Sequence, residues 1–208
     1  MTTSVAAIPS VKSKSKNAFI SLEKYFQAEE KALCKSEYHN GKIIEMAGGS
    51  VFHDNLSTIA ASLIDNFVED GNLQYIVNGS ETKIRIDAYN KVVYPDALVI
   101  LEKPIYYDNR TDTITNPLIV VEVLSKSTAD HDRTLKFNYY RSLESFKEYV
   151  LIHQDKKIIS VYTKQIDNTW LIRDYEGDDA VAILYALHQC PIPIKRLYRN
   201  MDLMKESA

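Results

Sequence analysis

The stretch LIVVEVL, residues 118–124, is apolar at every position except Glu122. An apolar run of this length predicts a central β-strand that is covered on both faces. Because side chains alternate along a strand, Glu122 should point the same way as Val120 and Leu124, into an apolar interior. An ionised carboxylate there costs several kcal/mol unless it is protonated, paired with a cation or bound to a metal. The glutamate therefore indicates either a functional site or a buried pair with a lysine or arginine.

The segments that follow this strand place it in a mixed sheet. A helical pattern runs from about Asp130 to Ser142, and another apolar strand is predicted from Glu148 to His153. A strand–helix–strand crossover of this kind usually joins parallel strands. The pattern therefore predicts an α/β fold of mixed α+β character, in which helices flank a central mixed β-sheet.

Further helices and strands surround this unit. One helix is expected after Ser21, its N-cap, and another after the break at residues 48–50, where an apolar stripe ends with Gly71 as the C′ residue. The dipeptide Asn40–Gly41 predicts a hairpin over residues 36–46. Other β-branched-rich runs predict strands at residues 73–77, 83–86, 92–101 and 158–163, with edge strands near 170–172 and 182–184.

Length and composition are those of one globular domain. The chain has 208 residues, of which 45% are hydrophobic and 25% charged, and residues 18–208 are expected to form one core. Residues 1–17 are rich in Ser, Thr and Lys, which predicts a disordered tail. No apolar run approaches the roughly 18 residues of a membrane span, and the N-terminus lacks the pattern of a secretory signal. These features predict a soluble, cytoplasmic protein.

Charge and cysteine content exclude other classes of protein. A net charge of −3 is too acidic for a protein that coats DNA, although it allows an enzyme that contacts nucleic acid through one local patch. Two cysteines, Cys34 and Cys190, are too few for a disulfide framework or a zinc site. A cysteine-based zinc module is thereby excluded.

A second carboxylate, Asp96, stands at the head of another apolar run. Pro95 before it removes a backbone donor and belongs at a strand end or edge, next to solvent or a cleft. Two acids on neighbouring strands can hold a hard divalent cation such as Mg²⁺, which keeps other positions for water and phosphate oxygens. Taken alone, an aspartate after proline is more often a turn residue.

The predicted crossover helix supplies a basic side chain. Asp132, Lys136 and Tyr140 are spaced i, i+4 and i+8, along one helix face. The first turns of this helix should lie near the carboxyl end of the strand that carries Glu122, where α/β sheets tend to bind ligands. An ammonium there could stabilise charge on a scissile phosphate or position an attacking water. An exposed Asp132–Lys136 helix pair is an equally natural interpretation.

The same residues resemble a known family. Pro95-Asp96, then Glu122 in a strand, then a lysine resembles the PD-(D/E)xK nuclease superfamily, and residues 35–163 are similar to the bacterial Uma-type restriction endonuclease family. The similarity covers about two thirds of the chain. It rests on these motifs: Ser36-Glu37-Tyr38 with Gly41, Met46-Ala47-Gly48-Gly49 with His53, Tyr94-Pro95-Asp96, Val121-Glu122-Val123-Leu124-Ser125 with Ser127-Thr128, Asp132-Arg133 with Lys136, Tyr139-Tyr140-Arg141, and Glu148-Tyr149-Val150-Leu151-Ile152.

The resemblance implies a restriction-endonuclease-like core and a metal-dependent enzyme. It implies that Asp96 and Glu122 bind Mg²⁺, for which Mn²⁺ can substitute, with the backbone carbonyl of Val123 as a further ligand. Where the superfamily usually has its lysine, two residues after the acid, this chain has Leu124, and Lys136 of the following helix takes that role. The secondary candidates, which have no assigned role, are Glu37, His53, Glu81, Ser125 and Asp132.

Three functions stay open at this point. The first is an endonuclease that hydrolyses DNA phosphodiester bonds, with a homodimer as one way to cut both strands. The second is a catalytically inactive nuclease-like scaffold that binds nucleic acid or a protein partner. The third is a purely structural Glu122–Lys136 pair that holds the crossover helix on the sheet. Metal titration of the wild type and of Glu122→Gln distinguishes the first function, which alone requires a metal at this carboxylate. The third predicts a large loss of stability in Lys136→Met.

Overall fold

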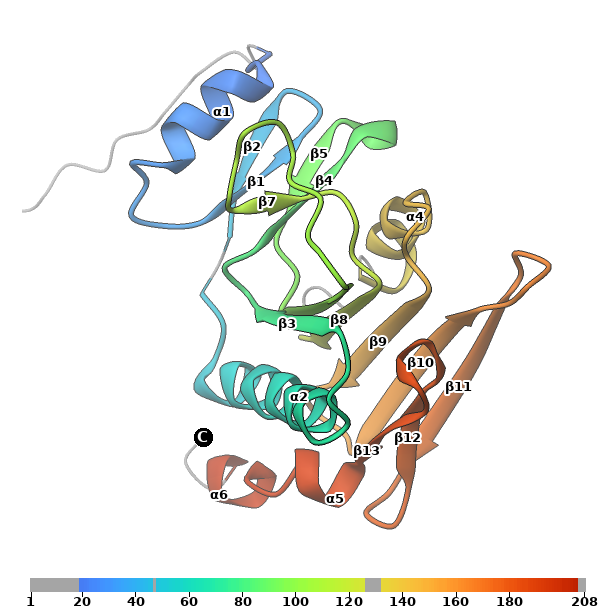
Figure 1. Cartoon of the computed structure of the whole chain (residues 1–208). Helices are drawn as coiled ribbons and strands as arrows, with labels where there is room; N and C mark the ends of the chain where they lie inside the picture. Colours follow the sequence, from blue (N-terminus) through green and yellow to red (C-terminus); the bar gives the residue numbers. More distant parts are fainter. Residues whose placement is uncertain (1–18, 47, 126–131, 206–208) are drawn as a thin grey trace, which may run out of the picture.

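The structure, a computed structural model, describes residues 19–46, 48–125 and 132–205, and its largest element is a six-stranded sheet (Figure 1). The tail predicted for residues 1–17 lies outside the described residues. The strand order is β11-β10-β9-β8-β6-β3. The strands are β3 (Tyr75–Gly79), β6 (Ala97–Leu101), β8 (Ile119–Leu124), β9 (Glu148–His153), β10 (Ile158–Lys164) and β11 (Trp170–Glu176). β8 and β9 run parallel and the other neighbours run antiparallel, which confirms the predicted crossover and mixed sheet.

Strand β8 is buried along its whole length, as its apolar run predicts. Val121 and Val123 belong to the core cluster formed with helix α2 (Val51–Asp70), whereas Leu124 belongs to a second cluster on the opposite face. Alternation places Glu122 on the same face as Leu124. Burial of each apolar side chain of β8 stabilises the fold by roughly 1.5–3 kcal/mol, so the strand can tolerate one charged position.

Both predicted helix starts are confirmed. Helix α1 (Leu22–Glu29) begins after Ser21, whose hydroxyl accepts a 3.3 Å hydrogen bond from the Lys24 N–H. Helix α2 begins after Ser50, whose hydroxyl accepts a 3.1 Å hydrogen bond from the His53 N–H. Each cap satisfies a backbone donor that the first helical turn leaves free.

The end of α2 differs from the prediction that Gly71 is the C′ residue. Gly71 is the C-cap, with a right-handed φ of −83°, and Asn72 follows it with a left-handed φ of +48°. The N–H groups of Asn72 and Leu73 each bond back to carbonyls of the last helical turn at 3.0 Å, which is a Schellman motif. Asparagine tolerates the left-handed conformation, so the helix ends one residue later than predicted.

A five-stranded sheet covers the other face of β8. Its order is β2-β1-β5-β4-β7, and its strands are β1 (Ser36–His39), β2 (Lys42–Glu45), β4 (Lys83–Ile86), β5 (Lys91–Val93) and β7 (Thr113–Ile114). β1 and β2 form the predicted hairpin, with Asn40 and Gly41 at φ +46° and +89°. Apolar side chains of β4 and β5 pack with β6, β8 and helix α4 (Phe137–Tyr140). The face of β8 that carries Glu122 is thus enclosed between two sheets.

The single strand predicted over residues 92–101 is wrong. The segment forms two strands, of which β5 belongs to the smaller sheet and β6 to the larger one. Tyr94, Pro95 and Asp96 between them belong to no strand. Pro95 has no N–H with which to continue a ladder, and the chain passes from one sheet to the other at this point. Asp96 therefore lies at the junction of the two sheets.

The crossover helix is shorter than predicted and partly π-helical. A π-helical turn, η2 (Asp132–Lys136), leads directly into α4, which ends at Tyr140. The predicted start at Asp130 lies outside the described residues. Asp132, Lys136 and Tyr140 are all buried, which confirms that they share one face and excludes an exposed helix pair. Single π turns are frequent at functional sites.

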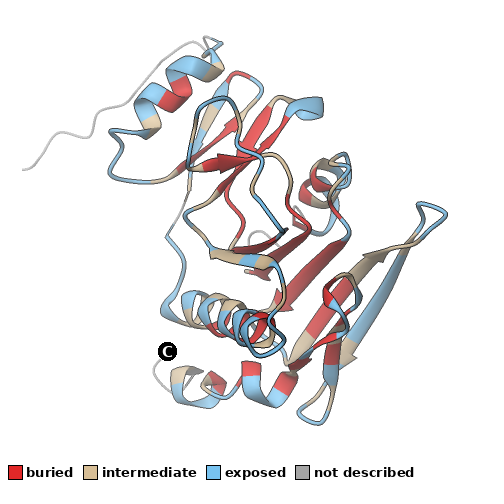
Figure 2. Ribbon diagram, viewed as in Figure 1, coloured by how far each residue is buried: buried red, intermediate tan, exposed pale blue. Residues whose placement is uncertain are grey.

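The C-terminal part completes the core beside α2 (Figure 1). Strands β12 (Val181–Leu184) and β13 (Cys190–Pro193) pair antiparallel, and helices α5 (Ile194–Leu197) and α6 (Met201–Lys205) follow. Buried residues of β12, β13 and α5 join the cluster formed by α2, and Figure 2 shows this burial in red. Within the three described ranges, no helix is long and apolar enough to cross a membrane.

Candidate functional site

The Glu122 carboxylate is bound by two side chains of the crossover helix. Lys136 Nζ lies 3.0 Å from Glu122 Oε1, and the Tyr140 hydroxyl donates a 2.9 Å hydrogen bond to the same oxygen. The Glu122 side chain is 5% exposed and that of Lys136 11%. The structure thus brings together two of the residues predicted from the sequence, in a charge-assisted contact shielded from water.

Lys136 lies among three carboxylates. Besides Glu122, its Nζ is 3.7 Å from Asp132 Oδ1 and 3.8 Å from Glu37 Oε1. Burial by itself would lower the pKa of Lys136, but the charges of these carboxylates outweigh it and raise the pKa above its ordinary value. Lys136 is therefore a fixed ammonium at neutral pH.

The environment of Glu122 favours an additional cation. Burial raises the pKa of Glu122 well above its ordinary value, and the negative charges of Asp96 and Asp132 raise it further. The positive charge of Lys136 lowers it, but does not outweigh burial. A bound cation would lower the free energy of the ionised carboxylate, because it replaces part of the lost hydration. Both hydrogen bonds that join the Glu122 side chain to other described residues end on Oε1, and among those residues Oε2 receives none.

Asp96 lies beside Glu122, where the β6–β8 ladder ends. One step beyond the last paired residues of that ladder, Asp96 stands opposite Glu122. Asp96 Oδ2 accepts a 2.7 Å hydrogen bond from the Val123 N–H, and Oδ1 lies 2.9 Å from His53 Nε2. The two predicted acids are therefore neighbours where the paired strands β6 and β8 end, and Asp96 is oriented by groups from β8 and α2.

His53 acts as a hydrogen-bond partner of Asp96. The hydrogen bond to the carboxylate raises the pKa of His53, although burial works in the opposite direction. From the next turn of α2, the Ser57 hydroxyl donates a 3.1 Å hydrogen bond to the Asp96 carbonyl. The start of α2 thus holds both the backbone and the side chain of Asp96.

The oxygen atoms at this edge suit a hard divalent cation. The N–H and C=O of one strand residue point the same way, so the Val123 carbonyl is directed to the side on which Asp96 lies. Mg²⁺ is typically held by one or two carboxylates and completes its octahedron with water and phosphate oxygens. The described part of the chain contains no group of three or more His, Cys, Asp or Glu side chains arranged to hold a metal. An ion here would therefore depend on Asp96, Glu122, the carbonyl and solvent.

Glu37 reaches the site from the smaller sheet. Its Oε1 accepts a 3.3 Å hydrogen bond from the Tyr94 N–H, and its Oε2 lies 2.7 Å from His39 Nε2. Burial works to raise the pKa of Glu37, but the His39 hydrogen bond, the charge of Lys136 and the Tyr94 N–H together lower it below its ordinary value. Glu37 is thus an ionised carboxylate on the side of Lys136 that faces β1.

The remaining secondary candidates differ in their positions. Glu81 is 85% exposed and forms a 2.6 Å ion pair with Lys35, so the structure places it outside the site. Ser125 directly follows the last residue of β8, next in the chain to the segment that carries Glu122. Ser127 and Thr128 lie outside the described residues. Asp132 joins the site through its contact with Lys136.

Two residues that interpretation of the sequence missed also belong to this region. Lys91 Nζ lies 2.6 Å from His39 Nδ1, and the two residues pair across β5 and β1. Burial lowers the pKa of Lys91, although the charge of Glu37 opposes this. The alternation of Glu37 and His39 along β1 was a signal that could have identified His39. No local spacing relates Lys91 to either residue.

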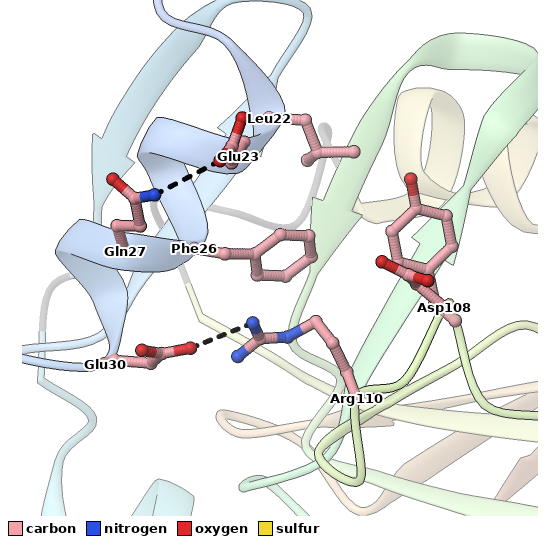
Figure 3. A pocket seen from close by; sticks show the side chains of 8 residues that line it. Leu22, Glu23, Phe26, Gln27, Glu30, Asp108 and Arg110 are labelled. Atoms are coloured by element: carbon pink, nitrogen blue, oxygen red, sulfur yellow. Dashed lines mark hydrogen bonds and ion pairs between the residues drawn. The ribbon is translucent and has the colours of Figure 1, made fainter.

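A surface pocket beside α1 is separate from this site (Figure 3). Arg110 crosses it toward α1, forming a 3.0 Å ion pair with Glu30 and lying over the Phe26 ring. Glu23 and Asp108 also line it. The pocket contains none of the carboxylates around Lys136, and its one guanidinium, that of Arg110, is already paired with Glu30. Its lining therefore gives no reason to assign it a catalytic role.

Comparison with known proteins identifies the family. The sequence matches the Uma2 family, described as "Putative restriction endonuclease", over residues 22–193. The chain belongs to this family. Two relatives are the uncharacterized proteins sll1609 and slr1290 of Synechocystis sp. (strain ATCC 27184 / PCC 6803 / Kazusa). The protein sll1609 is 37% identical over 156 residues, which are 75% of this chain and 87% of the relative. The protein slr1290 is 34% identical over 165 residues, which are 79% of this chain and 84% of the relative.

A solved structure shows the same fold. The crystal structure of a putative nuclease belonging to DUF820 from Anabaena variabilis matches this Uma2 chain with a TM-score of 0.70 at 19% sequence identity. The match covers 88% of this chain and 99% of that one. The predicted resemblance to the Uma-type family and the predicted mixed α/β nuclease-like fold are therefore confirmed.

Proposed function

We propose that this Uma2 protein is a metal-dependent endonuclease that hydrolyses phosphodiester bonds of DNA. The observation that carries the proposal is the position of Glu122, a carboxylate on an otherwise apolar central strand, beside a lysine and opposite a second acid. A core rarely gains stability from such a group, since a buried ion pair is seldom better than an apolar pair of the same size. A site for a divalent cation and phosphate requires it. Membership of the Uma2 family supports the same class of reaction.

In this proposal Lys136 acts on the substrate as a fixed cation. Its ammonium is held by Glu122 and by Asp132, which lies one turn earlier in the crossover helix. A positive charge fixed beside the scissile phosphate stabilises the negative charge that develops in the transition state. Because its pKa is raised, Lys136 donates hydrogen bonds and does not serve as a general base.

Asp96 and Glu122 supply the oxygens that would hold the metal, together with the Val123 carbonyl. When bound, Mg²⁺ would lower the pKa of a water ligand and polarise the phosphate. His53 and the Val123 N–H keep the Asp96 carboxylate in one orientation. Tyr140 does the same for Glu122 by donating a hydrogen bond to Oε1.

Nicking of supercoiled plasmid tests the proposal. The wild type, Asp96→Asn, Glu122→Gln and the control Glu69→Gln, an exposed position on α2, are incubated with Mg²⁺ or Mn²⁺, and thermal unfolding verifies that each is folded. The wild type and the control should nick the plasmid, and the two site variants should be slower by at least ~100-fold. A parallel series with single-stranded RNA tests the preference for DNA. If the wild type and Asp96→Asn leave DNA equally intact over several metals and sequences, the proposal is wrong.

A non-catalytic scaffold is the second candidate, and one feature favours it. Both oxygens of Asp96 and one oxygen of Glu122 already have partners within the protein. Such a scaffold would bind DNA without metal and without turnover. Calorimetric titration with Mn²⁺ separates the candidates, because the nuclease gives a binding heat that Glu122→Gln loses. The scaffold, like a purely structural Glu122–Lys136 pair, gives no heat in either protein.

A further inference from the structure

A chain of polar side chains continues behind Lys136 into the smaller sheet. Glu37 Oε1 lies 3.8 Å from Lys136 Nζ, Glu37 Oε2 lies 2.7 Å from His39 Nε2, and His39 Nδ1 lies 2.6 Å from Lys91 Nζ. The side chains of Glu37 and His39 are 9% and 13% exposed, and Lys91 is buried. These contacts connect the candidate site to β5, and the cleavage proposed above assigns no role to them.

The strand geometry explains why these residues meet. Alternation along β1 puts Glu37 and His39 on one face and Tyr38 on the other, in an aromatic cluster with Tyr25. His39 pairs with Lys91 across the antiparallel β1–β5 ladder. The three side chains are therefore fixed by the sheet itself, and sites built on strands are held more accurately than sites on loops.

Lys91 determines which nitrogen of His39 carries the proton. An ammonium has donors and no acceptor, so the 2.6 Å contact makes His39 Nδ1 the acceptor. A neutral imidazole then carries its proton on Nε2, from which it donates to Glu37 Oε2. The Lys91 ammonium also lies over the ring of Tyr139, 4.3 Å from its centroid. Tyr139 belongs to the crossover helix, which also carries Lys136 and Tyr140.

We propose that Glu37 is a positioning residue for Lys136, and that His39 and Lys91 hold Glu37 in the orientation that this requires. The inference rests on the proposed role of Lys136 in phosphodiester cleavage. Lys136 has Glu122 on the side of the larger sheet and Glu37 on the side of the smaller one. When Glu122 shares its charge with a bound cation, Glu37 on the smaller sheet and Asp132 on the crossover helix itself remain as the anions beside the ammonium, and only Glu37 fixes its position relative to the sheet.

Kinetics of matched variants test the positioning role. Glu37→Gln keeps an acceptor for the Tyr94 N–H but removes the charge, and His39→Leu removes the donor to Glu37. Both should lower kcat for plasmid nicking by roughly 10-fold or more with little change in KM. In His39→Gln the amide nitrogen can replace Nε2–H as the donor, and this variant should recover most of the loss seen in His39→Leu. Glu69→Gln serves as the folded control.

Nitrogen-15 NMR of the full-length protein gives a readout that needs no activity. In the wild type, His39 should show the Nε2-protonated tautomer, and an Nδ1-protonated tautomer would overturn the role of Lys91. The Lys136 Nζ resonance should move in Glu37→Gln and His39→Leu and stay in place in His39→Gln and Glu69→Gln. A resonance that does not move in either of the first two overturns the positioning role. Should Glu37→Gln fail to fold, the two His39 variants decide the question.

The same experiment separates the two proposals. If the wild type leaves plasmid intact while the Lys136 resonance responds as expected, the proposed nuclease activity is wrong, but Glu37 still positions Lys136. If the wild type cuts DNA while the resonance and kcat are unchanged in Glu37→Gln, the nuclease stands and the positioning role is wrong.

Discussion

Lys136 Nζ and Glu122 Oε1 form a buried 3.0 Å ion pair between the crossover helix and the central strand. The pair attaches the helix to the sheet and also lies at the centre of the candidate site. A substitution that removes either side chain from the pair therefore affects stability and activity together. The predictions below separate the two effects by pairing each site variant with a control or a second measurement.

Lys136→Met should destabilise the fold by roughly 3–5 kcal/mol, because it leaves the Glu122 carboxylate buried without its cation. Urea unfolding measures the change. Lys157→Met is the control, since its 2.8 Å pair with Asp178 is partly exposed to solvent and should contribute much less to stability than the buried pair. Equal and small losses in the two variants would show that the buried pair adds nothing to stability.

Glu122→Gln should separate activity from stability. The amide oxygen can still accept the hydrogen bonds from Lys136 and Tyr140, and Glu37 and Asp132 still face the ammonium, so the loss of unfolding free energy should be smaller than in Lys136→Met. Plasmid nicking should fall by at least ~100-fold, because the charge that would bind the metal is lost. Retained nicking in a folded Glu122→Gln protein would contradict the assignment of this carboxylate as a metal ligand.

Tyr140→Phe removes a single donor to Glu122 and should cost roughly 1.5–3 kcal/mol of stability, the range for a hydrogen bond to a charged group. Tyr198→Phe is a matched control, because the Tyr198 hydroxyl bonds at 2.7 and 2.8 Å to neutral backbone carbonyls. Its loss should be about 1 kcal/mol. Thermal unfolding of both variants measures the difference, and a loss in Tyr140→Phe no larger than that in Tyr198→Phe would contradict a hydrogen bond strengthened by charge.

Asp112 should make stability depend on pH in the acid range. Burial works to raise its pKa, but hydrogen bonds from Arg110, Lys83 and Thr113 lower it below its ordinary value of 3.8. Because the folded pKa is the lower one, the carboxylate stabilises the fold fully above the ordinary pKa, and this contribution is lost as the pH falls below it. The side chain is 38% exposed, so solvent screening limits the contribution to about 1 kcal/mol or less.

Stability curves of the wild type and Asp112→Asn check this pH dependence. The difference in unfolding free energy should be constant at neutral pH and shrink as the pH falls below the ordinary carboxyl pKa. A difference that grows toward acid pH would contradict the direction of the shift. Asp65→Asn, at an exposed position on α2, controls for the loss of one negative charge.

The fold was predictable where its determinants are local. The apolar run at residues 118–124 identified β8, Asn40–Gly41 identified the hairpin, and hydroxyl caps identified the starts of α1 and α2. The break at Pro95 was visible in the sequence, but the division of residues 92–101 between two sheets was not. Which strands pair depends on contacts between distant segments, and no periodicity within a segment encodes them.

For the candidate site too, residues marked by a pattern within one segment could be predicted, whereas contacts between distant segments could not. Glu122 was identified because it interrupts an apolar strand, and the helical spacing identified the face of Lys136. The contact between Glu37 and Lys136 depends on how the two sheets pack, and the pair of His39 and Lys91 depends on the β1–β5 register. The motif assigned no role to Glu37 for this reason. The metal and the roles in catalysis stay predictions until the titration and the nicking assay are done.

The residues around Lys136 are far apart in the sequence, so they are synthesised at different times during translation. Glu37 emerges early, Glu122 much later and Lys136 last. A nascent or truncated polypeptide that ends before the crossover helix carries the acids without the ammonium, and it lacks β9, the parallel partner of β8. Under the proposed function, a chain released before residue 136 therefore lacks both the lysine assigned to cleavage and the parallel strand beside Glu122.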